Sequence, residues 1–208
     1  MAENHFVQHV AMGDVHVLRL ANPPVNTLRT EIRAGLYDGM KAARAAGAKA
    51  VVIIGTGRMF CAGAEMTEFG KPRIPPSLTE VFEQFEAFPG LTVAAIHGSA
   101  LGGGLEVALA CHARVALADA NLGLPEVKRG FVPGAGGTQR LPRLIGPEAA
   151  LKIIVPGEPV KATEALKLGF ERAKSRRGVG DREWLARGVE TDIEAFLRNI
   201  DANELKIC

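Results

Sequence analysis

Short apolar runs alternate along this chain with segments whose apolar residues have helical spacing. Ala50–Ile54 and Thr92–Ile96 are continuous apolar runs, typical of strands buried on both faces of a sheet. Val15–Leu20 and Ala113–Leu117 predict two more strands, the first of mixed pattern and the second short. Helices are predicted over residues 78–88, 105–111, 137–145, 147–155 and 161–168, and from a cap at Thr27 or Thr30 to about Ala46.

The character of the chain changes after Gly169. Residues 171–187 are heavily charged, and residues 192–200 have the pattern of one further helix. Strands and helices alternate before this point in strand–strand–helix units, without an obvious sequence repeat. We therefore predict an α/β core over residues 1–170 and a charged, partly helical C-terminal appendage over residues 171–208.

Composition narrows the class of protein. A chain of 208 residues, 47% hydrophobic and 23% charged, is ordinary for a globular domain, and a net charge of +2 gives no case for nucleic-acid binding. The three cysteines are widely spread, which favours a reducing compartment and indicates neither a disulfide framework nor a metal site. We see no signal peptide, and the apolar runs are too short to span a bilayer, so we expect a cytoplasmic protein without membrane contact.

Candidate chemistry lies in two glutamates beside glycine-rich backbone. Glu106 ends the segment Leu101–Glu106, which contains three consecutive glycines, and Glu126 follows Pro125. Glycine lets a backbone approach a ligand closely, and a carboxylate beside such a loop can move protons. The residues themselves therefore suggest a site where backbone N–H groups hold an oxyanion while two carboxylates handle protons and water.

These motifs resemble the crotonase superfamily, which includes enoyl-CoA hydratases and isomerases. The resemblance covers roughly residues 15–170 and is strongest to the hydratase/isomerase domain of multifunctional β-oxidation enzymes. It rests on segments 22–28, 60–65 and 94–98 and on nearly all of residues 100–146. It implies a spiral of repeated ββα units, an acyl-CoA thioester ligand, no metal or redox cofactor, and a homo-oligomer, trimeric or hexameric.

The resemblance also assigns roles to individual residues. The amides of Ala62 and Gly103 would form an oxyanion hole, and Glu106 and Glu126 would be the catalytic carboxylates. Gly63, Ala64 and Glu65 would border the bound substrate, with Gly134 in the glycine-rich loop that shapes one wall of the pocket. Glu65 departs from the family pattern, since many relatives carry Asp at this position.

Hydration of a 2-enoyl thioester is the reaction that this set of residues predicts. Glu106 would activate water and Glu126 would deliver the α-carbon proton, a division of labour that the resemblance suggests. A Δ3-Δ2 isomerisation, which needs only one carboxylate, is also expected to be within reach of the site. Two other readings stay open at this point. One is a different acyl-CoA enolate reaction, such as thioester hydrolysis or dehalogenation, and the other is a non-catalytic acyl-CoA-binding or assembly subunit.

Overall fold

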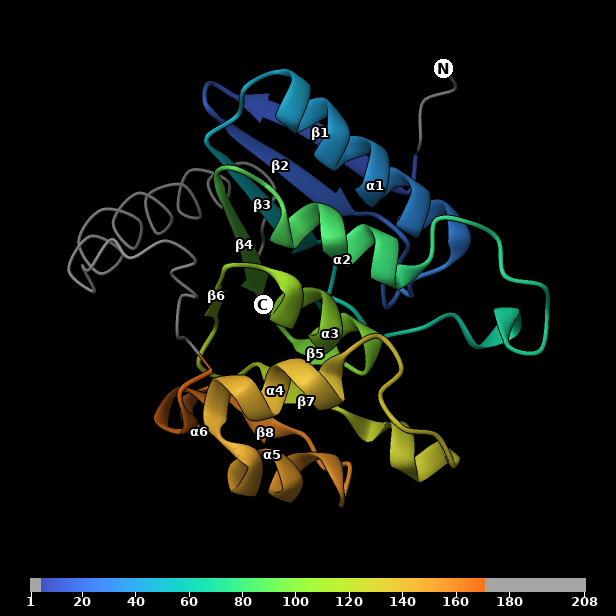
Figure 1. Ribbon diagram of the computed structural model, residues 1–208, viewed down its shortest axis with the longest axis vertical. Helices are drawn as coiled ribbons and strands as arrows, with labels where there is room; N and C mark the ends of the chain where they lie inside the picture. The colour runs from blue at the N-terminus through green and yellow to red at the C-terminus, as the bar shows by residue number, and fades with distance from the viewer. Residues whose placement is uncertain (1–4, 171–208) are drawn as a thin grey trace. The chain divides into compact units, whose positions relative to one another are not determined.

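A computed structural model describes residues 5–170 of the chain (Figure 1). The charged appendage predicted over residues 171–208 lies outside the described residues. The strands are β1 Val7–Met12, β2 Val15–Leu20, β3 Ala50–Gly55, β4 Leu91–Ile96, β5 Ser99–Leu101, β6 Ala113–Ala116, β7 Asn121–Gly123 and β8 Val160–Lys161. The helices are α1 Thr30–Ala45, α2 Leu78–Glu86, α3 Gly103–Ala110, α4 Gly137–Ile145, α5 Pro147–Ile154 and α6 Ala162–Leu168, with 3₁₀ turns η1 Met66–Glu68 and η2 Pro125–Arg129.

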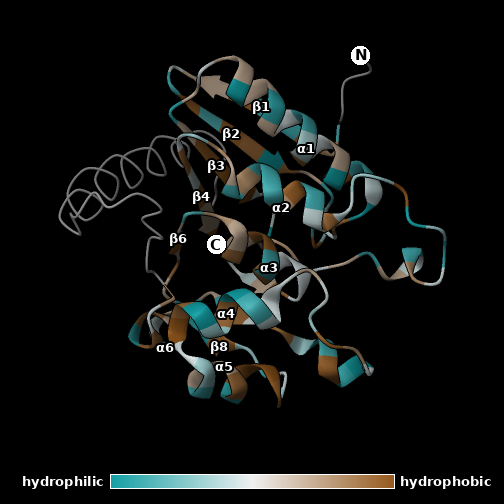
Figure 2. Cartoon of the chain, viewed as in Figure 1, coloured by the Kyte–Doolittle hydropathy of each residue, from teal (hydrophilic) through white to brown (hydrophobic). Residues whose placement is uncertain are grey.

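The larger sheet has five strands in the order β1-β2-β3-β4-β6, and all its pairings are parallel except β1 with β2. Its central strands are apolar on both faces, as buried parallel strands require, and they are brown in Figure 2. In Figure 1, α1 and α2 lie along one face of this sheet.

The smaller sheet explains the ββα repeat. It has three strands in the order β5-β7-β8, and Cys61 adds a single parallel bridge to Ala100 on β5. Three times in succession, the chain adds a strand to the larger sheet and then an extended segment to the smaller one. The pairs are β3 with the segment at Cys61, β4 with β5, and β6 with β7. The predicted spiral of ββα units is therefore confirmed.

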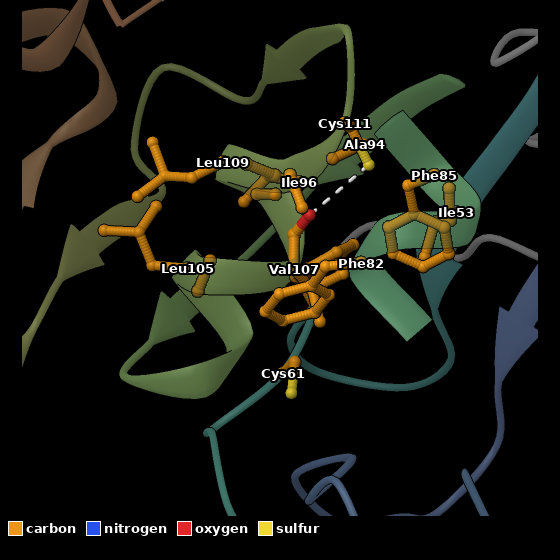
Figure 3. Packing of buried hydrophobic residues seen from close by; sticks show 14 of the residues in the cluster. Ile53, Cys61, Phe82, Phe85, Ala94, Ile96, Leu105, Val107, Leu109 and Cys111 are labelled. Carbon is orange, nitrogen blue, oxygen red and sulfur yellow. Dashed lines mark hydrogen bonds between the residues drawn. The ribbon is translucent and has the colours of Figure 1, made fainter. Parts of the chain in front are cut away.

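Buried apolar side chains of α2, α3 and β4 pack together in one part of the core (Figure 3). Phe82 and Phe85 of α2 are fully buried. Cys61 and Cys111 are buried as well, and burial raises the pKa of each thiol to about 12. The Cys111 thiol donates to the Val107 carbonyl over 3.4 Å. Cys61 therefore fills space in the core as a neutral thiol, and this residue is not a nucleophile.

The predicted helices and the longer strands are confirmed within a few residues, but two details differ. Strand β1 and the very short strands β5, β7 and β8 were not predicted, since β1 is mostly exposed and the others lack a full period of alternation. Helix α1 has no threonine cap: Arg29 is its N-cap residue and makes no capping bond, while Glu68 accepts from the Thr30 amide over 2.7 Å.

Candidate active site

The site begins where β5 turns into α3. Gly102 precedes the helix with φ 53°, a conformation that glycine adopts without strain, and its amide donates to the Gly123 carbonyl over 2.9 Å. Gly103 is therefore the first helical residue, and the first amides of a helix lack acceptors within it. The positive end of the helix dipole adds to the attraction for an anionic oxygen at this point.

The loop after β3 is fixed against this helix start. Cys61 donates its amide to Ser99 over 3.1 Å and accepts at its carbonyl from the Leu101 amide over 3.0 Å. Gly63 has φ 105°, and a β-carbon built on it would lie 2.8 Å from the Leu101 carbonyl oxygen and 3.3 Å from the Gly103 nitrogen. Only glycine fits here, because any side chain would separate the two loops.

The structure contradicts the assignment of Ala62 to the oxyanion hole. Its amide donates to the Val25 carbonyl over 2.9 Å, so this N–H is already committed within the protein. The amide of Ala64, two residues further on, has no acceptor among the described residues. The amide of Gly103 has no acceptor among them either. A β-carbon built on Gly103 would lie 3.5 Å from the Ala64 nitrogen. The pair of neighbouring unpartnered amides is therefore Ala64 and Gly103.

Glu106 lies one turn into α3 and is only 2% exposed. Its Oε1 accepts two backbone bonds, each of 2.8 Å, from the amides of Ala135 and Gly137. Burial raises the pKa of this carboxyl, while the two amides and the nearby Arg140 charge oppose that rise. Its Oε2 has no donor within the described part of the chain. One oxygen thus orients the group, and the other remains available to a ligand or water.

Glu126 lies in η2, and its Oε1 faces the start of α3: a β-carbon built on Gly102 would lie 3.1 Å from that atom. Burial, reinforced by the negative charge of Glu106, raises the pKa of Glu126 to about 7. Its Oε2 is buried and has no hydrogen-bond partner among the described residues. A buried carboxyl oxygen without a partner is costly, so its persistence indicates a group reserved for a ligand.

The structure thus brings together Glu106, Glu126, Gly63 and Gly103, and it adds Ala64 as an amide donor. At neutral pH the Glu126 carboxyl exchanges readily between its two protonation states, because its pKa is about 7. Two interacting carboxyls beside unpartnered amides can donate one proton and accept another while the amides stabilise an oxyanion.

Glu65 and Gly134 adjoin the site in the sequence: Glu65 follows Ala64, and Gly134 precedes Ala135. Glu65 accepts from the Thr27 hydroxyl over 2.7 Å and from the Thr67 amide over 3.1 Å, and it is the N-cap of η1. These bonds hold the pKa of Glu65 below its usual range. Gly134 lies exposed in the loop before α4. Their predicted contacts with substrate stay predictions.

Asn26 is a positioning residue that the sequence analysis missed. It is fully buried with φ 52°, and its amide group donates over 2.8 Å to the carbonyls of both Thr56 and Met59. Its side-chain oxygen accepts from the Asn22 amide over 3.0 Å. It therefore fixes the segment before α1 to the loop that leads into Cys61. The only sequence signal was an asparagine after a proline pair, which a simple turn explains equally well.

This fold, with the buried Glu106, the half-buried Glu126 and the neighbouring unpartnered amides of Ala64 and Gly103, defines a crotonase-fold protein. The chain belongs to the enoyl-CoA hydratase/isomerase family, whose model matches residues 11–176. It resembles a crystal structure of enoyl-CoA hydratase from Bacillus anthracis with a TM-score of 0.73 and 34% sequence identity, over 80% of this chain and 68% of that one.

Two curated relatives show how much of a longer protein the chain matches. A probable enoyl-CoA hydratase of Bacillus subtilis (strain 168) is 47% identical over 164 residues, which are 75% of this chain and 64% of that protein. The peroxisomal bifunctional enzyme of Danio rerio is 50% identical over 157 residues, which are 75% of this chain and 22% of that protein. The match thus covers under two thirds of the bacterial relative and about a fifth of the fish one.

Among residues 5–170, no three His, Cys, Asp or Glu side chains are grouped so that they could hold a metal ion. Across the same residues, none of the helices has the length and hydropathy needed to cross a membrane.

Proposed function

We propose that this chain adds water across the 2,3 double bond of a 2-enoyl-CoA thioester. One observation carries the proposal: the unpartnered amides of Ala64 and Gly103 lie beside the Glu126 carboxyl, whose buried Oε2 has no protein partner among the described residues. Family membership and the hydratase relatives support the same reaction.

The oxyanion hole accounts for activation of the substrate. When water adds to the β-carbon, the electron pair of the double bond moves toward the thioester and negative charge collects on its carbonyl oxygen. Two fixed N–H donors stabilise that enolate more than the neutral thioester, and loss of one such donor typically costs ~10²–10³ in rate. Ala64 replaces Ala62 as the partner of Gly103 in this role.

The two glutamates account for the protons. Glu106, ionised and oriented by two amides, takes a proton from the attacking water at its free Oε2. Glu126, with a pKa of about 7, is partly protonated at neutral pH and gives its proton to the α-carbon of the enolate. One carboxyl gains the proton that the other loses, and exchange between the pair or with solvent restores the starting state.

A Δ3-Δ2-enoyl-CoA isomerisation is a second candidate activity. It needs one carboxyl to remove a proton from carbon 2 of a 3-enoyl thioester and return it to carbon 4, through a dienolate whose oxygen the same two amides would stabilise. The raised pKa of Glu126 and its free Oε2 favour this residue as the shuttle.

Exposed aromatic rings support an apolar acyl substituent nearby: Phe69 and Phe131, from the two loops that flank the site, lie 5.3 Å apart between ring centroids.

The remaining expectations belong to the same proposal. The reaction uses no metal or redox cofactor, and coenzyme A enters as part of the substrate. A homo-oligomer, trimer or hexamer, is supported by exposed apolar side chains on α5, at its C-terminal end and on α6, namely Leu151, Val155 and Leu166. A cytoplasmic location is proposed alongside these points.

Product analysis tests the proposal against its alternatives. The purified chain is incubated with crotonyl-CoA, and the products are identified by mass spectrometry. A product heavier by one water with coenzyme A retained is expected for hydration. Release of free coenzyme A would show that the reaction is thioester hydrolysis and not hydration. Binding of 2-enoyl-CoA thioesters without any change of mass, together with an unchanged double-bond position in 3-enoyl-CoA thioesters, would favour a non-catalytic acyl-CoA-binding subunit.

A further inference from the structure

Arg140 and Glu106 both bond to the glycine-rich loop before α4. Arg140 belongs to α4, and its side chain is only 17% exposed. Its Nε donates to Glu86 at the end of α2 over 2.8 Å, and its guanidinium carbon lies 5.3 Å from the centroid of the buried Phe82 ring. These contacts with α2 fix the guanidinium, and most of the side chain's rotameric freedom is already lost.

The second contact of Arg140 is with the loop that orients Glu106. Its Nη1 donates to the Ala135 carbonyl over 2.7 Å. The amide of the same residue, Ala135, donates to Glu106 Oε1, as does the amide of Gly137. The peptide held by Arg140 therefore lies between the two peptides that hold Glu106. Its orientation sets the direction in which both amides point.

Gly136 shows how closely the guanidinium packs on this turn. It has φ 101°, and a β-carbon built on it would lie 2.2 Å from Arg140 Nη1. The turn and the arginine thus occupy complementary space, and glycine is the residue that permits this approach. A lysine keeps the charge, but its single ammonium cannot reproduce the fork that reaches both Glu86 and Ala135.

We propose that Arg140 is a positioning residue for Glu106: by holding the Ala135 carbonyl it fixes the two amides that orient the Glu106 carboxylate. Arg140 does not touch the substrate in this scheme. The inference rests on the proposed function for its effect on turnover, while its effect on Glu106 itself is independent of that function.

The test compares Arg140→Gln and Arg140→Lys with Arg143→Gln in the full-length protein. Arg143 is a matched control, because it lies on the same helix and, among residues 5–170, its Nη1 bonds only to Gln139, over 2.6 Å and 3.0 Å. Two quantities are measured: the turnover number and KM for crotonyl-CoA hydration, and the pH titration of the Glu106 carboxyl carbon by NMR. Glu106 is assigned in the NMR spectrum by the loss of its signal in Glu106→Gln.

Arg140→Gln is expected to lower kcat roughly 10²-fold with KM little changed, since small displacements of a catalytic group cost that much. It is also expected to raise the pKa of Glu106, because the Arg140 charge and the two amide bonds both hold it down. The charges acting on Glu106 are those of Arg140 and Glu126, and Glu126 is unchanged in all the variants. Arg140→Lys should recover the titration and part of kcat.

Equal kcat and equal Glu106 titration in Arg140→Gln and Arg143→Gln would overturn the inference. If Arg140→Gln does not fold, Glu86→Gln takes its place and is expected to shift both quantities in the same direction by less; no shift in either would then overturn it. If the wild-type chain hydrates nothing, the proposed function fails, but the Glu106 titration still decides the role of Arg140.

Discussion

The carboxylate of Glu126 faces Gly102, the N-cap residue of the helix that carries Glu106. A β-carbon on Gly102 would lie 3.1 Å from Glu126 Oε1, and Gly102 has φ 53°. This contact links the carboxyl to the helix end whose first amide, that of Gly103, is proposed to bind the thioester oxygen. The absence of a side chain at Gly102 is therefore a requirement of the site as well as of the turn.

Gly102→Ala is accordingly expected to displace Glu126 and tilt the first turn of α3, lowering kcat for crotonyl-CoA hydration about 10²-fold. The matched control is Gly146→Ala. Gly146 is the N-cap of α5, also has positive φ, and has open space around its α-carbon. That variant should lose about 1–2 kcal/mol of stability from the backbone strain but keep its turnover. Similar turnover in the two variants would contradict the role given to Gly102.

Gly63→Ala tests the contact between the two oxyanion loops. Its β-carbon would meet the Leu101 carbonyl oxygen at 2.8 Å, so the Ala64 amide must move away from Gly103. We expect a loss of ~10²–10³ in kcat, the size of one lost oxyanion donor. Gly57→Ala is the control, because Gly57 also has positive φ but nothing within 4 Å of the built carbon. Steady-state kinetics on both variants checks this.

Stability should depend on pH through Glu126. Its pKa is raised from 4.5 to about 7 in the folded protein, so folding favours the protonated carboxyl. The contribution of Glu126 to the free energy of unfolding is fully present below about pH 4.5 and is lost as the pH rises through about 7. Urea unfolding across that window should therefore show the wild type losing stability relative to a variant that lacks the Glu126 carboxyl.

Glu126→Gln should show a shallower fall across the same window, with a remainder from Glu106, whose pKa is also raised. Glu148→Gln is the control and should keep the wild-type slope, since Glu148 is an exposed partner of Lys152. An identical slope in Glu126→Gln and wild type would mean that the Glu126 carboxyl titrates normally in the folded protein.

Asn26→Ala should cost about 2 kcal/mol or more, because it leaves the carbonyls of Thr56 and Met59 without their buried donor. Urea unfolding measures the loss. Asn121→Ala serves as comparison, since the Asn121 side chain makes only two long bonds of 3.4 Å. A loss in Asn26→Ala no larger than in Asn121→Ala would remove Asn26 from the residues that fix the loop before Cys61.

The sequence was sufficient to predict most of the fold and both glutamates. Buried parallel strands such as Ala50–Gly55 are continuous apolar runs, and the longer helices carry clear stops or caps, so both are visible in the chain itself. Glu106 and Glu126 were predicted for a similar reason. Each is a charged residue placed among glycine, proline and apolar neighbours, where a surface carboxylate is not expected.

The sequence could not distinguish Ala62 from Ala64. Both are alanines beside Gly63, and only the tertiary structure shows that the Ala62 amide is taken by Val25. Arg140 is a similar case, since its partners Glu86 and Ala135 lie on different elements and the arginine has the pattern of an ordinary helix surface residue. Contacts between segments that are distant in the sequence produce no local periodic pattern, so the sequence alone does not predict them.

The central claim is that Glu106 and Glu126 act together on a thioester held by two amides. It is tested most directly by the turnover number for crotonyl-CoA hydration of Glu106→Gln and Glu126→Gln beside the wild type, with binding of a saturated acyl-CoA measured by calorimetry. Each variant should lose ~10²–10⁴ in kcat while acyl-CoA binding persists, as expected for loss of a general acid or base. Near wild-type turnover in both variants would contradict the account.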